Sequence, residues 1–115
     1  MALEIHQRQR EGITVLDLKG RITVGPEASA LREKVADLGQ VGDRKLVFNM
    51  ADVDYIDSTG LGELVSVYRQ VKSHGGELKL LNLNKKVSDL LQITKLYAVF
   101  DVHNDEAQAV ASFQS

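Results

Sequence analysis

The sequence predicts an α/β fold in which a mixed, largely parallel β-sheet of about five strands packs against about four helices. Short β-branched and apolar runs alternate along the chain with longer segments whose apolar residues recur at helical spacing. Strands separated by helices pair mainly in parallel. The chain has 115 residues, 43% apolar and 26% charged, which suits one globular domain. We therefore expect a single domain over residues 1–115, with a core from about residue 5 to residue 113.

The N-terminal part of the chain predicts two antiparallel strands joined by a turn. Leu3 to Arg8 alternates weakly between apolar and polar residues, and Gln9 to Gly12 has the composition of a turn. Ile13 to Lys19 is rich in β-branched residues. We expect the next segment, Gly20 to Gly25, to be a connector.

The middle of the chain predicts two long helices around one buried strand. Pro26 suits the first turn of a helix, which extends to about Leu38 through apolar residues at helical spacing: Ala28, Leu31, Val35 and Leu38. Leu46 to Phe48 is typical of a strand covered on both faces. A second helix ends at His74, before Gly75 and Gly76, and its apolar stripe consists of Leu61, Leu64, Val65, Tyr68 and Val71.

The last third of the chain predicts two strands and two shorter helices. Glu77 to Leu81 is an apolar run typical of a strand, and Lys85 to Ile93 has a helical pattern. Val99 to Val102 is predicted as an edge strand. Asp105 to Phe113 is predicted as a terminal helix with three residues facing inward: Ala107, Val110 and Ala111.

Composition excludes several classes of function. The net charge of −2 provides no basic surface for nucleic acid. The absence of cysteine excludes disulfides and thiolate chemistry. The N-terminus does not resemble a signal peptide, and no stretch approaches the ~18 apolar residues of a membrane span. We expect a small cytoplasmic protein that binds neither membrane nor nucleic acid directly.

The most informative segment is Asp57-Ser58-Thr59-Gly60-Leu61-Gly62, at the start of the second predicted helix. A helix N-terminus has unpaired backbone N–H groups and a partial positive charge, which favour a phosphate. A phosphate on Ser58 would add about −1.5 to −2 charges at pH 7, close to Asp54 and Asp57. The segment therefore predicts a switch that acts through an interface, with little change of fold.

The alternative is that Ser58 only caps the helix, a role worth about 1 kcal/mol. Gly60 and Gly62 argue against a simple cap, because each costs up to about 1 kcal/mol relative to alanine in a helix. We interpret these glycines as bare backbone that another protein can approach closely.

Enzyme and metal sites receive little support. Asp52 to Asp57 begins like a calcium loop or an aspartyl-phosphate site, but Ile56 occupies a ligand position and no further catalytic groups are assigned. Gly60-x-Gly62-x-x-Val65 lacks the third glycine of a dinucleotide fingerprint. The histidines are scattered, at His6, His74 and His103. We expect no catalytic residue and no metal site, although an anion-binding enzyme that uses the Ser58 helix start stays a rival hypothesis.

The segment Tyr55 to Gly62 resembles the signature of the STAS domain family, specifically the bacterial anti-sigma factor antagonists. The resemblance covers roughly residues 5–113. Other matching segments follow in family order: Gly20-Arg21-Ile22, Leu46 to Met50, Gly76 to Asn82, Val87 to Thr94, and Phe100.

The resemblance implies a partner-switching cycle. The unphosphorylated protein would bind an anti-sigma factor, itself a serine kinase, and so release a sigma factor. That kinase would phosphorylate Ser58, and a manganese- or magnesium-dependent serine phosphatase would restore it. ATP and the divalent metal would belong to these partners, so no cofactor of this chain is expected.

Carried over to this chain, the resemblance makes Ser58 the phosphate acceptor, with Thr59 as a second candidate. The docking surface would comprise Asp57, Ser58, Thr59, Gly60, Leu61 and Gly62, with Arg21, Ile22 and Thr23 from the loop Arg21 to Gly25. The chain departs from many relatives near Thr23, where they carry an acidic residue. The alternative within the family is a scaffold or transporter-associated subunit without a sigma-factor role. We expect a monomer or weak dimer.

Overall fold

The computed structural model describes residues 3–23 and 25–114. Val24, predicted in the connector, and the side chain of Ala28, predicted to face the core, lie outside the described residues. The helices and strands are β1 (Leu3–Arg10), β2 (Ile13–Ile22), α1 (Pro26–Gln40), β3 (Lys45–Ile56), α2 (Ser58–Ser73), β4 (Glu77–Leu81), α3 (Lys85–Ile93), β5 (Asp101–His103) and α4 (Glu106–Ala111). Two short 3₁₀ helices, Leu96–Ala98 and Ser112–Gln114, follow α3 and α4.

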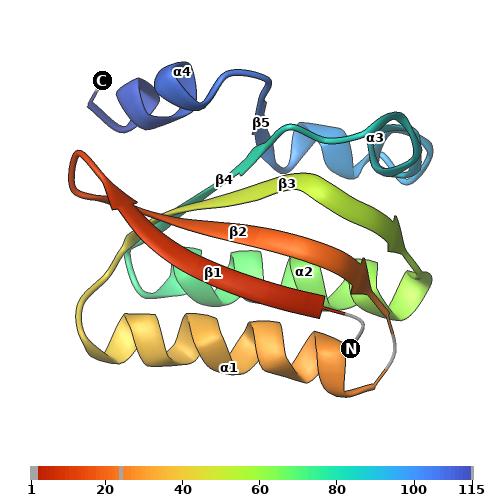
Figure 1. Cartoon of the computed structure of the whole chain (residues 1–115), viewed down its shortest axis with the longest axis horizontal. Helices are drawn as coiled ribbons and strands as arrows, with labels where there is room; N and C mark the ends of the chain where they lie inside the picture. The colour runs from red at the N-terminus through yellow and green to blue at the C-terminus, as the bar shows by residue number, and fades with distance from the viewer. Residues whose placement is uncertain (1–2, 24, 115) are drawn as a thin grey trace.

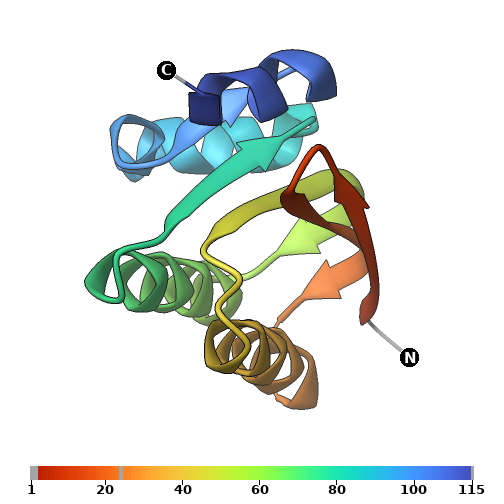
Figure 2. The ribbon, with the colours of Figure 1, turned by 90° about the vertical axis from the view of Figure 1, so that its left-hand side faces the viewer.

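The described strands form one 5-stranded sheet in the order β1-β2-β3-β4-β5. β1 and β2 pair antiparallel, and each later neighbour pairs in parallel. Helices α1 and α2 cover one face of this sheet, whereas α3 and α4 lie on the other (Figures 1 and 2). The predicted α/β fold with a mixed, largely parallel sheet is therefore confirmed.

Most of the buried residues form a core between the sheet and helices α1 and α2. Phe48 of β3 is fully buried and lies in register with Leu16 of β2 and Leu80 of β4. A smaller cluster lies beneath α4 and consists of Ile13, Val15, Val47, Leu81, Ala109, Val110 and Phe113. Because successive side chains of a strand point to opposite faces, Val47 and Phe48 belong to different clusters.

Strands β2 and β3 are longer than predicted, and their extra residues lie beside the start of α2. β2 continues to Ile22, which pairs with Ile56 of β3, so the prediction that a connector begins at Gly20 is wrong up to Ile22. The register shifts between Gly20 and Arg21, which interrupts the alternation that would have revealed a strand. The aspartates of the second half of β3 likewise lower its apparent strand propensity.

The inward face of helix α4 was predicted correctly at Val110 but not at Ala107 and Ala111. Ala109 and Val110 are buried, whereas Ala107 and Ala111, which were predicted to face inward, are exposed. Phe113 lies four residues beyond Ala109 and anchors the same face in the smaller cluster. The large ring of Phe113, rather than the small alanines, therefore decides how α4 packs.

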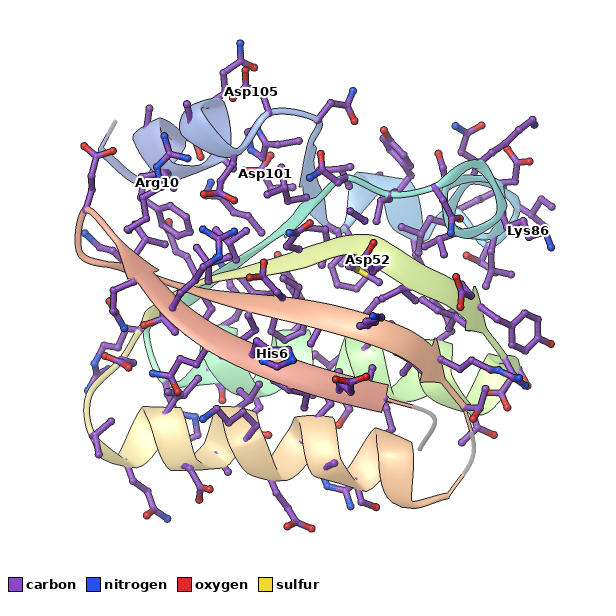
Figure 3. The ribbon with its side chains drawn as sticks, in the orientation of Figure 1. His6, Arg10, Asp52, Lys86, Asp101 and Asp105 are labelled. Carbon is purple, nitrogen blue, oxygen red and sulfur yellow. The ribbon has the colours of Figure 1, made fainter. Side chains whose placement is uncertain are left out.

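A charged cluster ties α4 to the N-terminal hairpin. The Arg8 guanidinium donates to Asp17 Oδ2 over 2.7 Å and to Glu106 Oε2 over 2.9 Å. Arg10, which Figure 3 shows beside α4, donates to Glu106 Oε2 over 2.8 Å. The hydrogen bond from Arg8 is the main cause that lowers the pKa of Glu106 from 4.5 to about 2. This residue is therefore a carboxylate at neutral pH.

Candidate functional site

The candidate site is the junction where β3 ends and α2 begins. Asp57 has extended backbone angles, φ −91° and ψ −179°, and its carboxylate Oδ1 accepts a hydrogen bond from the Gly60 N–H over 2.7 Å. The Asp57 N–H donates to the Ile22 carbonyl over 3.3 Å, which joins the junction to the end of β2. Asp57 is thus the N-cap of α2, and the alternative that Ser58 serves as this cap is wrong.

Ser58 is the first residue of α2 and its side chain is exposed, as is that of Thr59. Within residues 3–23 and 25–114, the Ser58 hydroxyl makes no hydrogen bond. The backbone N–H groups of the first turn give this end of the helix a partial positive charge. The hydroxyl is therefore accessible in a place where an added negative charge is electrostatically favoured.

Gly60 is required by the fold itself. A Cβ atom at this position would lie 1.8 Å from the Ile22 carbonyl oxygen and 2.6 Å from the Ile22 carbonyl carbon. Gly60 is buried, so its packing against β2 is a reason within the fold for a glycine here, and its predicted part in the docking surface stays a prediction. Gly62 is exposed and a Cβ there would meet nothing within 4 Å, so this position does present open backbone.

A groove of about 370 Å³ lies beside Ser58, between the start of α2 and helix α3. Its lining residues come from β3 and α2 on one side and from α3 with its C-cap on the other: Tyr55, Ile56, Asp57, Ser58, Leu61, Lys86, Val87, Leu90 and Thr94. Among these described residues, Asp57 is the one acid and Lys86 the one base. Figures 1 and 3 place Lys86 on α3, at the end of the molecule where β3 ends.

The predicted second contact segment, Arg21 to Gly25, is only partly a surface. Arg21 is exposed and lies in register with Tyr55 of β3, and Thr23 is half-buried. The Ile22 side chain is fully buried in the main core. Ile22 therefore supports the junction through its carbonyl group, which accepts from the Asp57 N–H, and its predicted part in partner binding stays a prediction.

A family model of the STAS domain matches residues 4–109. The chain belongs to the STAS domain family. A relative in Bacillus subtilis, named anti-sigma-B factor antagonist, is 37% identical over 102 residues, which cover 89% of this chain and 92% of the relative.

Solved structures share the fold of this STAS domain. An anti-sigma factor antagonist from Mycobacterium paratuberculosis superposes with a TM-score of 0.83 at 16% identity, covering 99% of this chain and 96% of the other. The Bacillus cell fate determinant SpoIIAA in its phosphorylated form superposes with a TM-score of 0.71 at 20% identity, covering 97% of this chain and 99% of the other. At these identities the likeness establishes the fold alone.

Several residues of the STAS domain site were missed by reasoning from the sequence. Lys86, Leu90 and Thr94 line the groove although they lie about 30 residues beyond Ser58 in the chain, and no pattern in the sequence links the two segments. Tyr55 is 50% exposed, and three further large apolar side chains are exposed at or after the end of α3: Ile93, Tyr97 and Val99. The one signal in the sequence for this side of the groove is the basic pair Lys85-Lys86 at the start of α3.

Other features of the STAS domain do not compete with this site. No group of three or more His, Cys, Asp or Glu side chains that could hold a metal ion occurs among the described residues. A second cavity, of about 310 Å³, lies between the C-terminal ends of α1 and α2 and contains none of the predicted site residues. In the described part of the chain, no helix is long and apolar enough to cross a membrane.

Proposed function

We propose that this STAS domain is an anti-sigma factor antagonist whose binding surface is switched by phosphorylation of Ser58. The observation that carries the proposal is the division of roles at the start of α2. Asp57 supplies the cap, which leaves the exposed Ser58 hydroxyl without a structural task among the described residues. The 37% identity with the Bacillus subtilis anti-sigma-B factor antagonist supports the antagonist role.

In the unmodified state, the surface around Ser58 would bind an anti-sigma factor and thereby release a sigma factor. Four predicted contact residues lie at or near this surface. Three of them are exposed and the last is half-buried: Thr59, Gly62, Arg21 and Thr23. Buried Gly60 and Ile22 would hold the junction in place. The groove beside Ser58 would receive apolar side chains of the partner, because most of its lining is apolar.

The partner is proposed to be a serine kinase that holds ATP and its divalent metal. The Ser58 Oγ atom would attack the γ-phosphorus of ATP, so that an O–P bond forms at Ser58 while the bond to the bridging oxygen of ADP breaks. The hydroxyl proton would pass to a base of the kinase. A metal-dependent serine phosphatase would return the hydroxyl by hydrolysis, with inorganic phosphate as the product.

The phosphate would act on the interface rather than on the fold. It would place about −1.5 to −2 charges beside Asp57, next to a largely apolar groove. The N-terminal end of α2 tolerates that charge, whereas a docked partner would have to desolvate it. Dissociation of the partner is the expected result.

The test is incubation with ATP and each serine-kinase anti-sigma factor of the source genome, followed by intact-mass and peptide-mapping mass spectrometry. The proposal predicts one added phosphate, located on Ser58. Ser58→Ala should bind the same kinase but take up no phosphate, and Thr59→Ala should be labelled like the unmodified chain. Unchanged labelling of Ser58→Ala would refute the assignment, and no labelling by any kinase would favour the scaffold or transporter-associated alternative.

A further inference from the structure

The groove beside Ser58 has one side from α2 and the other from α3. Asp57 and Ser58 line the first side, and Lys86 and Leu90 line the second. Lys86 is exposed and, within the described part of the chain, its ammonium makes no ion pair or hydrogen bond. The adjacent Lys85 differs, because its Nζ lies 2.9 Å from Asp89 Oδ2. Lys86 is therefore a basic residue of the groove lining whose ammonium has no partner within the described structure.

The charges of the groove are balanced only while Ser58 is unmodified. Asp57 contributes one negative charge and Lys86 one positive charge. A phosphate on Ser58 adds about −1.5 to −2 charges and three strong acceptor oxygens. Opposite charges attract more strongly beside an apolar surface than in bulk water. The long, flexible lysine stem allows the ammonium to move toward such a phosphate.

We propose that Lys86 binds the phosphate of phosphorylated Ser58 across the groove between α2 and α3. The inference rests on the proposed function only for the modification of Ser58, and it deepens that function by naming the group of this chain that recognises the phosphate. A phosphate held by Lys86 fills the mouth of the groove. The groove is then blocked for the partner, and the Ser58 hydroxyl is no longer free. The affinity of the partner should therefore fall further than charge repulsion alone would lower it.

The charged groups around the phosphate make opposite contributions to its second pKa. Asp57 at the cap raises this pKa, because it repels the dianion. Lys86 and the N-terminal end of α2 lower it. Arg21, at the end of β2 opposite Tyr55, does not line the groove.

The test measures the second pKa of the phosphate directly. Phosphoserine is placed at position 58 during translation by genetic-code expansion, so that no kinase is needed, and its ³¹P chemical shift is followed by NMR from pH 4 to 9. Lys86→Gln should raise the titration midpoint by about half a unit or more. Lys85→Gln removes a charge from the neighbouring position and should move the midpoint by less than half as much. Lys86→Arg should restore the low midpoint.

The proposal is overturned if Lys86→Gln moves the midpoint no more than Lys85→Gln does. It is also overturned if Lys86→Arg behaves like Lys86→Gln, since any side chain that retains the cation should retain the effect. Circular dichroism of each variant checks that α3 is intact. Because the phosphate is installed without a kinase, an unchanged midpoint refutes the role of Lys86 alone, whereas a failure of kinases to label Ser58 refutes only the proposed function.

Discussion

At the scale of single residues, the motif from Asp57 to Gly62 combines groups that hold the junction with groups that face solvent. Asp57 and Gly60 belong to the first kind, since one caps α2 and the other packs against the Ile22 carbonyl. Ser58 and Gly62 belong to the second kind. Short signatures of this kind are specific because neighbouring positions satisfy independent physical demands.

The two glycines of the motif should respond oppositely to the same substitution. Gly60→Ala should lower the free energy of unfolding by on the order of 3 kcal/mol, because its Cβ would overlap the Ile22 carbonyl, 1.8 Å away. Gly62→Ala should raise it by up to about 1 kcal/mol, because the site is open and alanine favours a helix. Urea denaturation of both variants checks this. Equal effects would show that α2 does not pack on β2 as described.

Two substitutions of Asp57 should distinguish the contribution of its hydrogen bond to stability from the contribution of its negative charge. Asp57→Ala removes the acceptor for the Gly60 N–H and should cost about 1 kcal/mol of stability. Asp57→Asn keeps an amide oxygen in the same place and should cost much less, since Asn is as good a cap as Asp. The comparison again uses urea denaturation. A similar loss in both variants would mean that the negative charge, rather than the cap, stabilises the junction.

At the scale of helices and strands, α1, α2, β4 and α3 could be predicted because each has a regular apolar pattern and a clear end, and the hairpin could be predicted from its turn residues and its β-branched second strand. The ends of β2 and β3 could not, because register shifts interrupt the alternation of β2 and the buried residues in the second half of β3 recur every third position: Met50, Val53 and Ile56. The same limit applies to the site. Ser58 lies in a recognisable motif, whereas Lys86 reaches the groove only through the packing of α3.

The attachment of α4 provides a prediction at this scale. Glu106 has a folded-state pKa of about 2, below its ordinary 4.5, so its contribution to stability is present above pH 4.5 and is lost as the pH falls toward 2. Glu106→Gln should therefore lower stability by about 1 kcal/mol at pH 7, as for a partly exposed ion pair. The difference from the unmodified chain should shrink between pH 4.5 and pH 2.

Urea denaturation at several pH values measures this difference. Glu33→Gln is the matched control, because Glu33 is exposed on α1 and makes no ion pair within the described residues. It should change stability little at any of these pH values. A Glu106→Gln deficit that persists unchanged at pH 2 would show that α4 is held by packing of Phe113 and its neighbours, not by the charges of Arg8 and Arg10.

At the scale of the whole molecule, the proposed phosphorylation site lies at one end of the domain and is not part of its buried core. The main core lies between the sheet and helices α1 and α2 and includes Val87 and Leu91 of α3, and the smaller core lies beneath α4. Ser58 is exposed outside both clusters. A charge added there should therefore alter what the surface binds while the packing of the sheet stays the same. The predicted extent of the domain, from residue 1 to residue 115, stays a prediction.

Ser58→Glu should lower the affinity for the anti-sigma factor without lowering the stability of the domain. A negative charge in the first turn of α2 interacts favourably with the helix dipole, so stability should stay equal or rise by about 0.3–1 kcal/mol. Affinity for the anti-sigma factor should fall, because the same charge lies at the proposed interface.

Ser66→Glu is the control, since Ser66 is exposed farther along α2. Calorimetric binding and urea denaturation measure both quantities. If both substitutions weakened binding equally, net charge rather than position would govern the switch; if Ser58→Glu unfolded the protein, the switch would act through the fold.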